Sequence, residues 1–265
     1  MSEVLEWIEV LAVAGVLAVL IMSFVTVRMH VPTGSMIPAI DPSDSFFVDR
    51  ISYLFREAKP GDIVVFWHTD SVHVRSIEAD SVAGRAGISR GLRVLSLNRN
   101  SIYSAAGADE ILAGIPVGTD LYLITYGDDQ QGGQMTDLGT KTSEMQTMAD
   151  LGLELRDRRI RYVKRLIAVG GQTVQIRNGD VYIDGEKLTG ERFDRTYVTN
   201  DSAMAYGIEP TLVPEGHWFV LGDNTRNSLD SRYWGFVDVD DFIGEPYFRV
   251  WPFSRLGPMN GYFGS

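Results

Sequence analysis

The sequence predicts a mostly β body of antiparallel strands that follows one N-terminal transmembrane helix and carries an inserted α+β segment. Three observations lead to this prediction. Residues 10–27 form an uncharged apolar run. Short segments rich in β-branched and aromatic residues follow it, separated by turn residues. Residues 174–176 and 181–183 flank an Asn-Gly pair at 178–179, which is a strong signal for a β-hairpin.

The apolar run sets the expectation for the N-terminus. Its 18 residues would form a helix of about 27 Å, close to the thickness of the hydrocarbon core of a bilayer. A buried helix or a cleaved signal sequence would also be apolar. Signal peptides begin with basic residues, however, whereas Glu3, Glu6 and Glu9 precede this run. We therefore expect one permanent membrane helix. The lone Arg28 after it weakly favours the cytoplasm for the C-terminal side.

The β segments come next, interrupted by two polar stretches. Strands are expected at 45–51, 62–67, 161–169, 217–221 and 242–251, the last of them interrupted by Pro246. Residues 127–150 have few large apolar side chains, so we expect a flexible linker there. Residues 191–210 are also polar without periodicity, which indicates a long surface excursion.

Composition excludes several classes of function. The chain has 265 residues, 45% of them hydrophobic, and a formal net charge of −11. An acidic chain lacks the basic face that nonspecific nucleic-acid binding needs. The sequence has no cysteine, which excludes disulfides and thiolate metal sites, and its four histidines show no metal-ligand motif.

A serine lies close to the end of the apolar run. Ser35 follows the run by eight residues, within Pro-Thr-Gly-Ser-Met-Ile-Pro at 32–38. A serine hydroxyl is a poor nucleophile unless a base removes its proton. Lys164, on the expected strand 161–169, can be such a base only if burial keeps its amine neutral. Its apolar neighbours fit burial, but spacing alone favours an ordinary lysine on an exposed strand face.

A polar loop follows the expected strand 217–221. Residues 222–235 read GDNTRNSLDSRYWG and are dense in Asp, Asn and Ser. Side-chain oxygens in such numbers could form a calcium-type loop, although the regular alternation and terminal glutamate of that loop are missing. A helix-capping cluster or a solvated turn is the alternative.

Together, four ordered segments resemble the type I signal peptidases in their bacterial Ser/Lys form. They are PTGSMIP at 32–38, GDIVVF at 61–66, YVKRLIAVGG at 162–171 and GDNTRNSLDSRYWG at 222–235. The last motif is highly specific, whereas GDIVVF alone would be weak. Their order, the expected membrane helix and the chain length agree with that family. The resemblance covers the β body and not residues 68–160.

The resemblance implies a membrane-bound serine endopeptidase that removes signal peptides from exported preproteins, cutting after small side chains. Ser35 would be the nucleophile and Lys164 the general base, while Ser228 would orient the lysine amine. The Ser35 backbone N–H and the Thr33 hydroxyl would hold the oxyanion. Met36 would face the substrate or the membrane. Four matched charged residues would brace the site: Asp223, Arg165, Asp230 and Arg232.

The resemblance also implies the surroundings of the enzyme. The bilayer would be a partner, with the catalytic body extracytoplasmic and the short N-terminus in the cytoplasm. No metal or organic cofactor is implied. Three departures put efficiency in doubt more than mechanism: Thr225-Arg226 replaces a common Arg-Asp pair, Gln172 replaces a common Asp, and Ala39 replaces a common Thr.

The inserted segment resembles a PDZ domain in part. The resemblance lies in residues 72–77, 80–88 and 94–98, followed by an expected helix at 108–113 and a strand at 118–123. The carboxylate-binding loop is not found before the first strand. Residues 151–155 are loosely similar to that loop but come later in the chain. The insert is then either a permuted PDZ domain, or the similarity is a coincidence. An intact groove would capture a peptide C-terminus by strand addition, whereas a degenerate module would be a spacer or lid.

These observations divide the chain as follows. The expected parts are a tail and membrane helix at 1–30, a discontinuous peptidase domain at 31–67 and 160–265, a PDZ-like insertion at 68–127 and a polar linker at 128–159. Two other functions stay open. One is a peptidase dedicated to a single partner that the insert selects, and the other is a catalytically silent anchor whose insert binds a partner.

Overall fold

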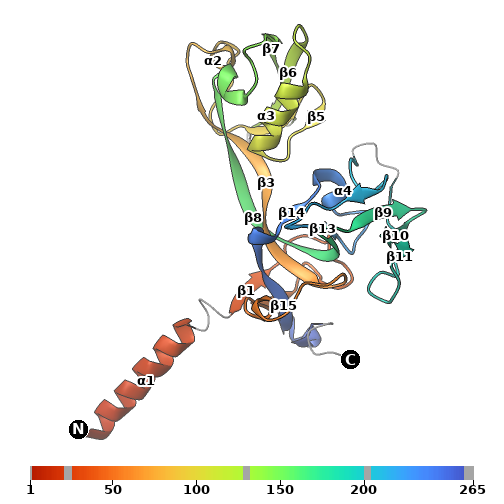
Figure 1. The fold of residues 1–265 in the computed structure, drawn as a ribbon. Coiled ribbons are helices and arrows are strands. Elements are labelled where there is room, and N and C mark those ends of the chain that lie inside the picture. The colour runs from red at the N-terminus through yellow and green to blue at the C-terminus, as the bar shows by residue number, and fades with distance from the viewer. Residues whose placement is uncertain (1, 21–25, 128–131, 200–203, 260–265) are drawn as a thin grey trace. The chain divides into compact units, whose positions relative to one another are not determined.

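The chain folds into two compact units joined by two long strands (Figure 1). The computed structural model describes residues 2–20, 26–127, 132–199 and 204–259. One unit comprises Met1–Trp67 and Arg161–Ser265, and the other comprises His68–Ile160. Strands β3 (Ile63–Ile77) and β8 (Leu153–Val169) each run from one unit into the other and pair with each other. The second unit is therefore an insertion between these strands.

The first unit is built from antiparallel strands. In its larger sheet, the strand order is β1-β2-β15-β3, and β8 pairs with both β3 and β13. Besides β3 and β8, the strands of this sheet that lie in the first unit are β1 (Thr26–His30), β2 (Ser45–Asp49), β13 (His217–Leu221), β14 (Val237–Asp238), β15 (Phe242–Trp251) and β16 (Gly257–Pro258). The first unit also contains four short helical turns: η2 (Ser52–Leu54), α4 (Ser231–Trp234), η4 (Val239–Asp241) and η5 (Phe253–Arg255).

A smaller sheet completes the first unit. Its four strands lie in the order β11 (Glu186–Lys187), β10 (Asp180–Ile183), β9 (Thr173–Arg177) and β12 (Thr211–Leu212). The expected hairpin at 174–183 is formed by β9 and β10, and Asn178 and Gly179 at its tip both have positive φ. An Asn-Gly pair suits such a turn because both residues tolerate that conformation.

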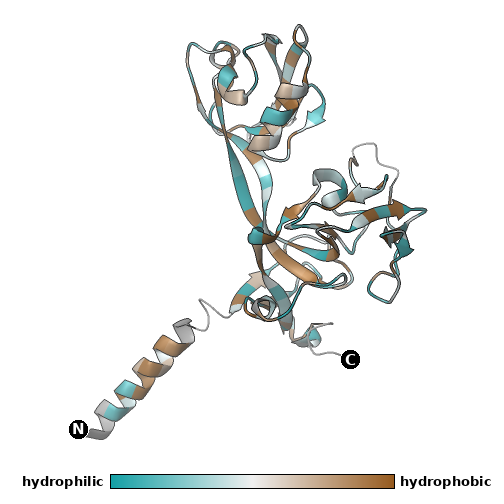
Figure 2. Cartoon of the chain, viewed as in Figure 1, coloured by the Kyte–Doolittle hydropathy of each residue, from teal (hydrophilic) through white to brown (hydrophobic). Residues whose placement is uncertain are grey.

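Strand β8 runs through the apolar interior of the first unit. Its residues 163–168 are all buried, so both of its faces are covered there. Val163, Leu166 and Ile167 each belong to a different apolar cluster of this unit. In Figure 2, brown, apolar residues occur where strands of the first unit pass through its interior. A polar side chain on this stretch is taken out of water by its neighbours.

The insertion is a small α+β unit with its own core. Its strands are β4 (Arg93–Leu97), β5 (Asn100–Ser101), β6 (Asp120–Tyr126) and β7 (Gln134–Thr140), and its helices are α2 (Val82–Arg85), α3 (Ala105–Gly114) and η3 (Met148–Leu151). Leu97, Leu112 and Leu121 are fully buried in its apolar cluster. The buried Lys141 donates to the carbonyls of Leu112 and Ile115 at the end of α3, at 2.5 and 2.6 Å. Whether this unit is a PDZ module stays a prediction.

The linker expected at 128–159 is wrong for the part of that segment that the structure describes. Strand β7 pairs with β6, and β8 begins at Leu153. Leu138, Met148 and Leu151 are buried in the core of the insertion. The segment has few apolar residues, but most of them are buried in this core or pack against it. Its low apolar content therefore concealed an ordered segment.

The N-terminal prediction also needs correction. Helix α1 spans Ser2–Leu20, whereas Thr26 and Val27 lie in β1 and pair with Asp49 and Val48. The apolar run at 10–27 is therefore not one helix. Among the residues described, the structure contains no helix with both the length and the apolar character needed to cross a bilayer.

Candidate active site

Ser35 lies in a turn region between β1 and β2. The backbone N–H of Ile37 donates to the Gly34 carbonyl at 3.3 Å, and that of Ile40 donates to Met36 at 2.9 Å. Met36 is fully buried in the apolar cluster beside β1 and β2, so the expectation that it faces substrate or membrane is wrong. Its thioether is instead packed into the core next to Ser35, which is itself only 7% exposed.

Lys164 meets Ser35 from strand β8. The distance between Lys164 Nζ and Ser35 Oγ is 2.9 Å, although the two residues are 129 positions apart in the sequence. The amine also donates to the Val163 carbonyl at 3.2 Å. Lys164 is only 2% exposed, so the alternative of an ordinary lysine on an exposed strand face is wrong.

Burial changes the protonation of this amine. Loss of hydration lowers the pKa of Lys164 to about 8, although Asp230 and Asp223 favour the ammonium form. The ring of Tyr162, whose centroid is 5.1 Å from Nζ, also favours the charged form. Desolvation outweighs these attractions, because a buried charge without a direct counterion is costly. A substantial fraction of the neutral amine is therefore present just above neutral pH.

Two hydroxyl groups expected at the site have different surroundings. Thr33 Oγ1 lies 3.4 Å from Ser35 Oγ, so it is close to the nucleophilic oxygen. Ser228 Oγ is buried and makes no hydrogen bond with any described residue. The bond expected between Ser228 and the lysine amine is thus not formed, and the partners of that amine are Ser35 and Val163.

The loop after β13 contacts the backbone around Ser35. Asn224 donates from its backbone N–H to the Ser35 carbonyl and from Nδ2 to the Gly34 carbonyl, both at 2.9 Å. A Cβ on Gly222 would lie 2.7 Å from the Ser35 carbonyl oxygen and closer still to Ser228 Oγ. Neither Gly222 nor Asn224 was predicted from the sequence to be a site residue. Their position directly after the strand, beside Asp223, was the available signal.

Two buried ion pairs lie beside the site. Asp223 accepts from Arg165 Nε at 2.7 Å and from its Nη2 at 2.5 Å, and it also contacts Arg195. Asp230 accepts from Arg232 Nε at 2.8 Å and also from the Gly222 N–H at 2.9 Å. Arg195 was missed because it lies in the polar stretch 191–210, whose sequence carries no periodic signal. That stretch is not wholly a surface excursion, since Tyr197 is 2% exposed.

Two of the sequence departures have structural explanations. The Thr225 hydroxyl donates to the Thr196 carbonyl at 2.7 Å, and the Thr225 carbonyl accepts from Arg232 at 3.0 Å. Gln172 Oε1 accepts from the Val169 N–H at 2.9 Å and so closes the turn after β8. Both residues therefore hold the loops next to the site through bonds of their own.

Replacing Asp223 with asparagine should destabilise the fold. The substitution leaves the buried guanidinium of Arg165 and the neighbouring Arg195 without their shared counterion. Breaking a buried pair in this way costs about 3–5 kcal/mol of unfolding free energy, measurable by urea denaturation. Asp180→Asn is the matched control, because its pair with Lys187 is exposed and contributes about 0–1 kcal/mol. Equal losses in the two variants would contradict the assigned role.

Comparisons with known proteins agree with this arrangement. The family model described as "Signal peptidase, peptidase S26" matches residues 4–251. A probable signal peptidase I-1 of Synechocystis sp. is 27% identical over 257 residues, covering 97% of this chain and 87% of that protein. A signal peptidase I of Leptolyngbya laminosa is 25% identical over 258 residues, covering 97% and 85% of the two chains.

A solved structure was also matched. It is a signal peptidase I from Enterococcus faecalis, 35% identical, which covers 32% of this chain and 81% of that chain with a TM-score of 0.26. The family model spans both the Ser35 turn and the Lys164 strand, and with them the loop at 222–235. The chain belongs to the signal peptidase family, peptidase S26.

Proposed function

We propose that this chain is a signal peptidase that cleaves signal peptides from exported preproteins, with Ser35 as nucleophile and Lys164 as general base. The observation that carries the proposal is the 2.9 Å separation of Ser35 Oγ and Lys164 Nζ in a buried setting. A general base must be within hydrogen-bond reach of the proton that it removes, and its pKa must lie near the working pH. The lowered pKa of Lys164 supports the second requirement.

The reaction proceeds in two halves. In the first, Ser35 Oγ bonds to the carbonyl carbon of the scissile amide while its proton passes to Lys164 Nζ. The C–N bond then breaks, the lysine ammonium returns that proton to the departing amine, and an acyl-enzyme remains on Ser35. In the second half, Lys164 takes a proton from water, the resulting hydroxide attacks the ester carbon, and Ser35 leaves with the proton.

The developing negative charge on the carbonyl oxygen needs hydrogen-bond donors. The Ser35 backbone N–H and the Thr33 hydroxyl take this role, supported by the 3.4 Å distance between Thr33 Oγ1 and Ser35 Oγ. The ion pairs Arg165–Asp223 and Arg232–Asp230 hold the surrounding loops. Ser228 lies next to Gly222, and its buried hydroxyl has no hydrogen-bond partner among the described residues.

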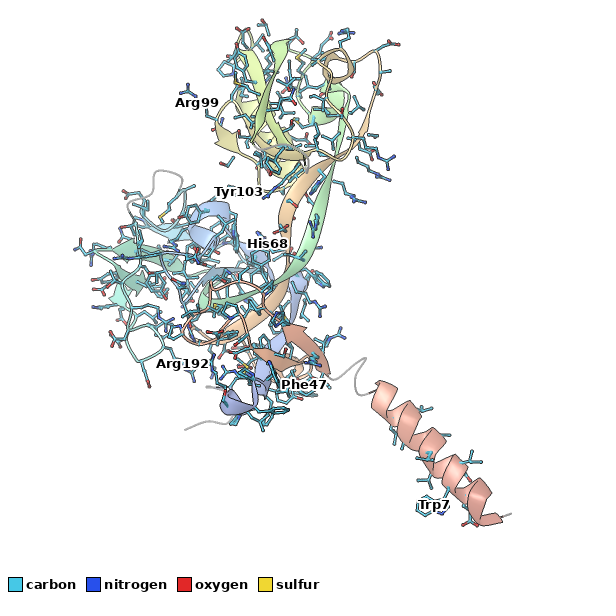
Figure 3. The ribbon with its side chains drawn as sticks, turned by 180° about the vertical axis from the view of Figure 1, so that it is seen from behind. Trp7, Phe47, His68, Arg99, Tyr103 and Arg192 are labelled. Carbon is cyan, nitrogen blue, oxygen red and sulfur yellow. The ribbon has the colours of Figure 1, made fainter. Side chains whose placement is uncertain are left out.

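The chain works at a bilayer in this proposal, with its active site on the extracytoplasmic side. Helix α1 supports the placement, because Trp7, Leu11 and Val16 are each at least 60% exposed. The Trp7 side chain projects from the helix in Figure 3. Exposed apolar groups of this size are stabilised by an apolar environment rather than by water.

A panel of unrelated preproteins tests the proposed substrate class. We expect the full chain to cleave several of them after small side chains of the Ala-x-Ala kind, with the new N-termini identified by mass spectrometry. Ser35→Ala is the matched negative control. Cleavage of a single preprotein from the panel would instead favour a peptidase dedicated to one partner. Absence of any cleavage would favour the silent anchor. Peptide binding by the insertion stays a prediction.

A further inference from the structure

A cavity of about 510 Å³ opens in the first unit, and most of its charged lining residues are arginines. Of the described residues that line it, five are arginines: Arg165, Arg192, Arg195, Arg249 and Arg255. Glu191 and Asp223 are its acidic lining residues. Neither Ser35 nor Lys164 lines it, so it is a different space from the one around the reacting atoms. Such a concentration of positive charge is unexpected in a chain of net charge −11.

The carboxylates near the cavity do not balance its guanidinium groups. Asp223 is shared between Arg165 and Arg195. Asp44, which is fully buried, is shared between Arg249 and Arg255 at 3.0 and 3.2 Å. Glu191, Asp223 and Asp44 give three carboxylates against five guanidinium groups. The half-buried Asp41 interacts with Arg249 and Arg255 from outside the lining, which makes four carboxylates in all. Positive charge remains in excess, so the cavity favours an anionic ligand.

An apolar segment adjoins the cationic lining in the sequence. Arg255 ends the short turn η5, and the exposed side chains of Trp251, Phe253 and Leu256 lie within four residues of it. Trp251 and Phe253 pack edge to face with their ring centroids 4.9 Å apart. Exposed aromatic side chains next to arginines suit the interface of a bilayer, where apolar acyl chains lie beside charged headgroups.

We propose that this cavity binds the phosphate of an anionic phospholipid headgroup while the aromatic side chains of segment 251–256 contact the acyl region. Guanidinium groups donate planar pairs of N–H bonds that match phosphate oxygens. Arg192 is exposed and forms no ion pair with another residue that the structure describes, so it is available to such a ligand (Figure 3). The proposal rests on the membrane placement proposed above, and it adds a preference for one class of lipid.

Native mass spectrometry of the detergent-purified full chain tests the proposal. The protein is incubated with equimolar phosphatidylglycerol and phosphatidylcholine, and the lipid adducts are counted. We expect phosphatidylglycerol adducts to exceed phosphatidylcholine adducts about tenfold, since only the former has net negative charge. The double variant Arg192→Gln/Arg255→Gln should lose this preference. Arg99→Gln/Arg177→Gln changes net charge equally at exposed positions outside the cavity and should retain it.

Three outcomes would overturn the lipid assignment. They are equal adducts of the two lipids, an equal loss in both double variants, and displacement of phosphatidylglycerol by an equal concentration of inorganic phosphate. The last would identify a site for soluble phosphate. Cleavage of a soluble peptide in the same detergent is measured in parallel. Parental cleavage by Arg192→Gln/Arg255→Gln separates a failure of the lipid proposal from a failure of the proposed peptidase activity.

Discussion

Replacing Lys164 with methionine should abolish preprotein cleavage while making the protein more stable. The base lies 2.9 Å from Ser35 Oγ, and the remaining partner of the amine is a backbone carbonyl. Without it, the serine keeps its proton, and we expect kcat/KM to fall by about 10³-fold or more. Methionine is unbranched and of similar length, so the site stays filled. Ser35→Ala should cause a loss of the same order.

The stability change follows from the protonation of the buried amine. Its pKa in the folded protein is about 8, below the ordinary lysine value of 10.5 that applies to the unfolded chain. The cost of burying the ammonium is fully present below the folded pKa and disappears as pH rises through the unfolded pKa. Methionine has no such cost. Lys164→Met should therefore gain on the order of 3 kcal/mol of unfolding free energy at neutral pH and nothing at strongly alkaline pH.

This pairing of effects distinguishes lost chemistry from a damaged fold. Lys187→Ala and Ser43→Ala change exposed residues and should leave both cleavage and urea denaturation near parental values. A Lys164→Met protein that still cleaves would show that another group removes the serine proton. A Lys164→Met protein that is inactive and also strongly destabilised would contradict the claim that the buried Lys164 ammonium destabilises the parent protein.

Replacing Gly222 with alanine should misplace the nucleophile. The new Cβ would stand 2.7 Å from the Ser35 carbonyl oxygen, a separation that real Cβ atoms essentially never show, and closer still to Ser228 Oγ. Because the Ser35 carbonyl also accepts from the Asn224 N–H at 2.9 Å, the displacement would move the backbone that carries the hydroxyl. A shift of about 1 Å costs on the order of 10²-fold in rate. Overpacking also costs about 1–3 kcal/mol of stability.

A matched glycine gives the control for this variant. Gly114 ends α3, has an ordinary φ and leaves open space for a Cβ, so Gly114→Ala should cleave at the parental rate. Cleavage assays and urea denaturation on both variants separate the two effects. Parental activity in Gly222→Ala would show that the loop after β13 does not set the position of Ser35.

The sequence predicted much of the site because its chemistry is concentrated in short motifs. Ser35, Lys164, Asp223 and Arg165 lie in such motifs, and the structure places them within one region of the first unit. The apolar neighbours of Lys164 fitted burial, but spacing alone favoured an exposed lysine, because the sequence does not show that both faces of this strand are covered.

Other features depend on contacts between distant segments and left no local signal. Arg195 comes from a polar stretch without periodicity, yet it contacts the buried Asp223. The apolar run at 10–27 gave no sign that Val27 pairs with Val48 in a sheet, because hydropathy does not distinguish a buried strand from a membrane helix over so few residues. The burial of Leu138 and Met148 was also not predicted, because isolated apolar residues in a polar segment show no periodic pattern.

The pH dependence of kcat/KM on a soluble peptide substrate is the most direct test of the dyad. The free enzyme should lose activity on the acid side with an apparent pKa of about 8, because protonated Lys164 cannot accept the serine proton. An activity that stays constant from mildly acidic to mildly alkaline pH, or an acid limb near the ordinary histidine value of about 6.5, would contradict Lys164 as the general base.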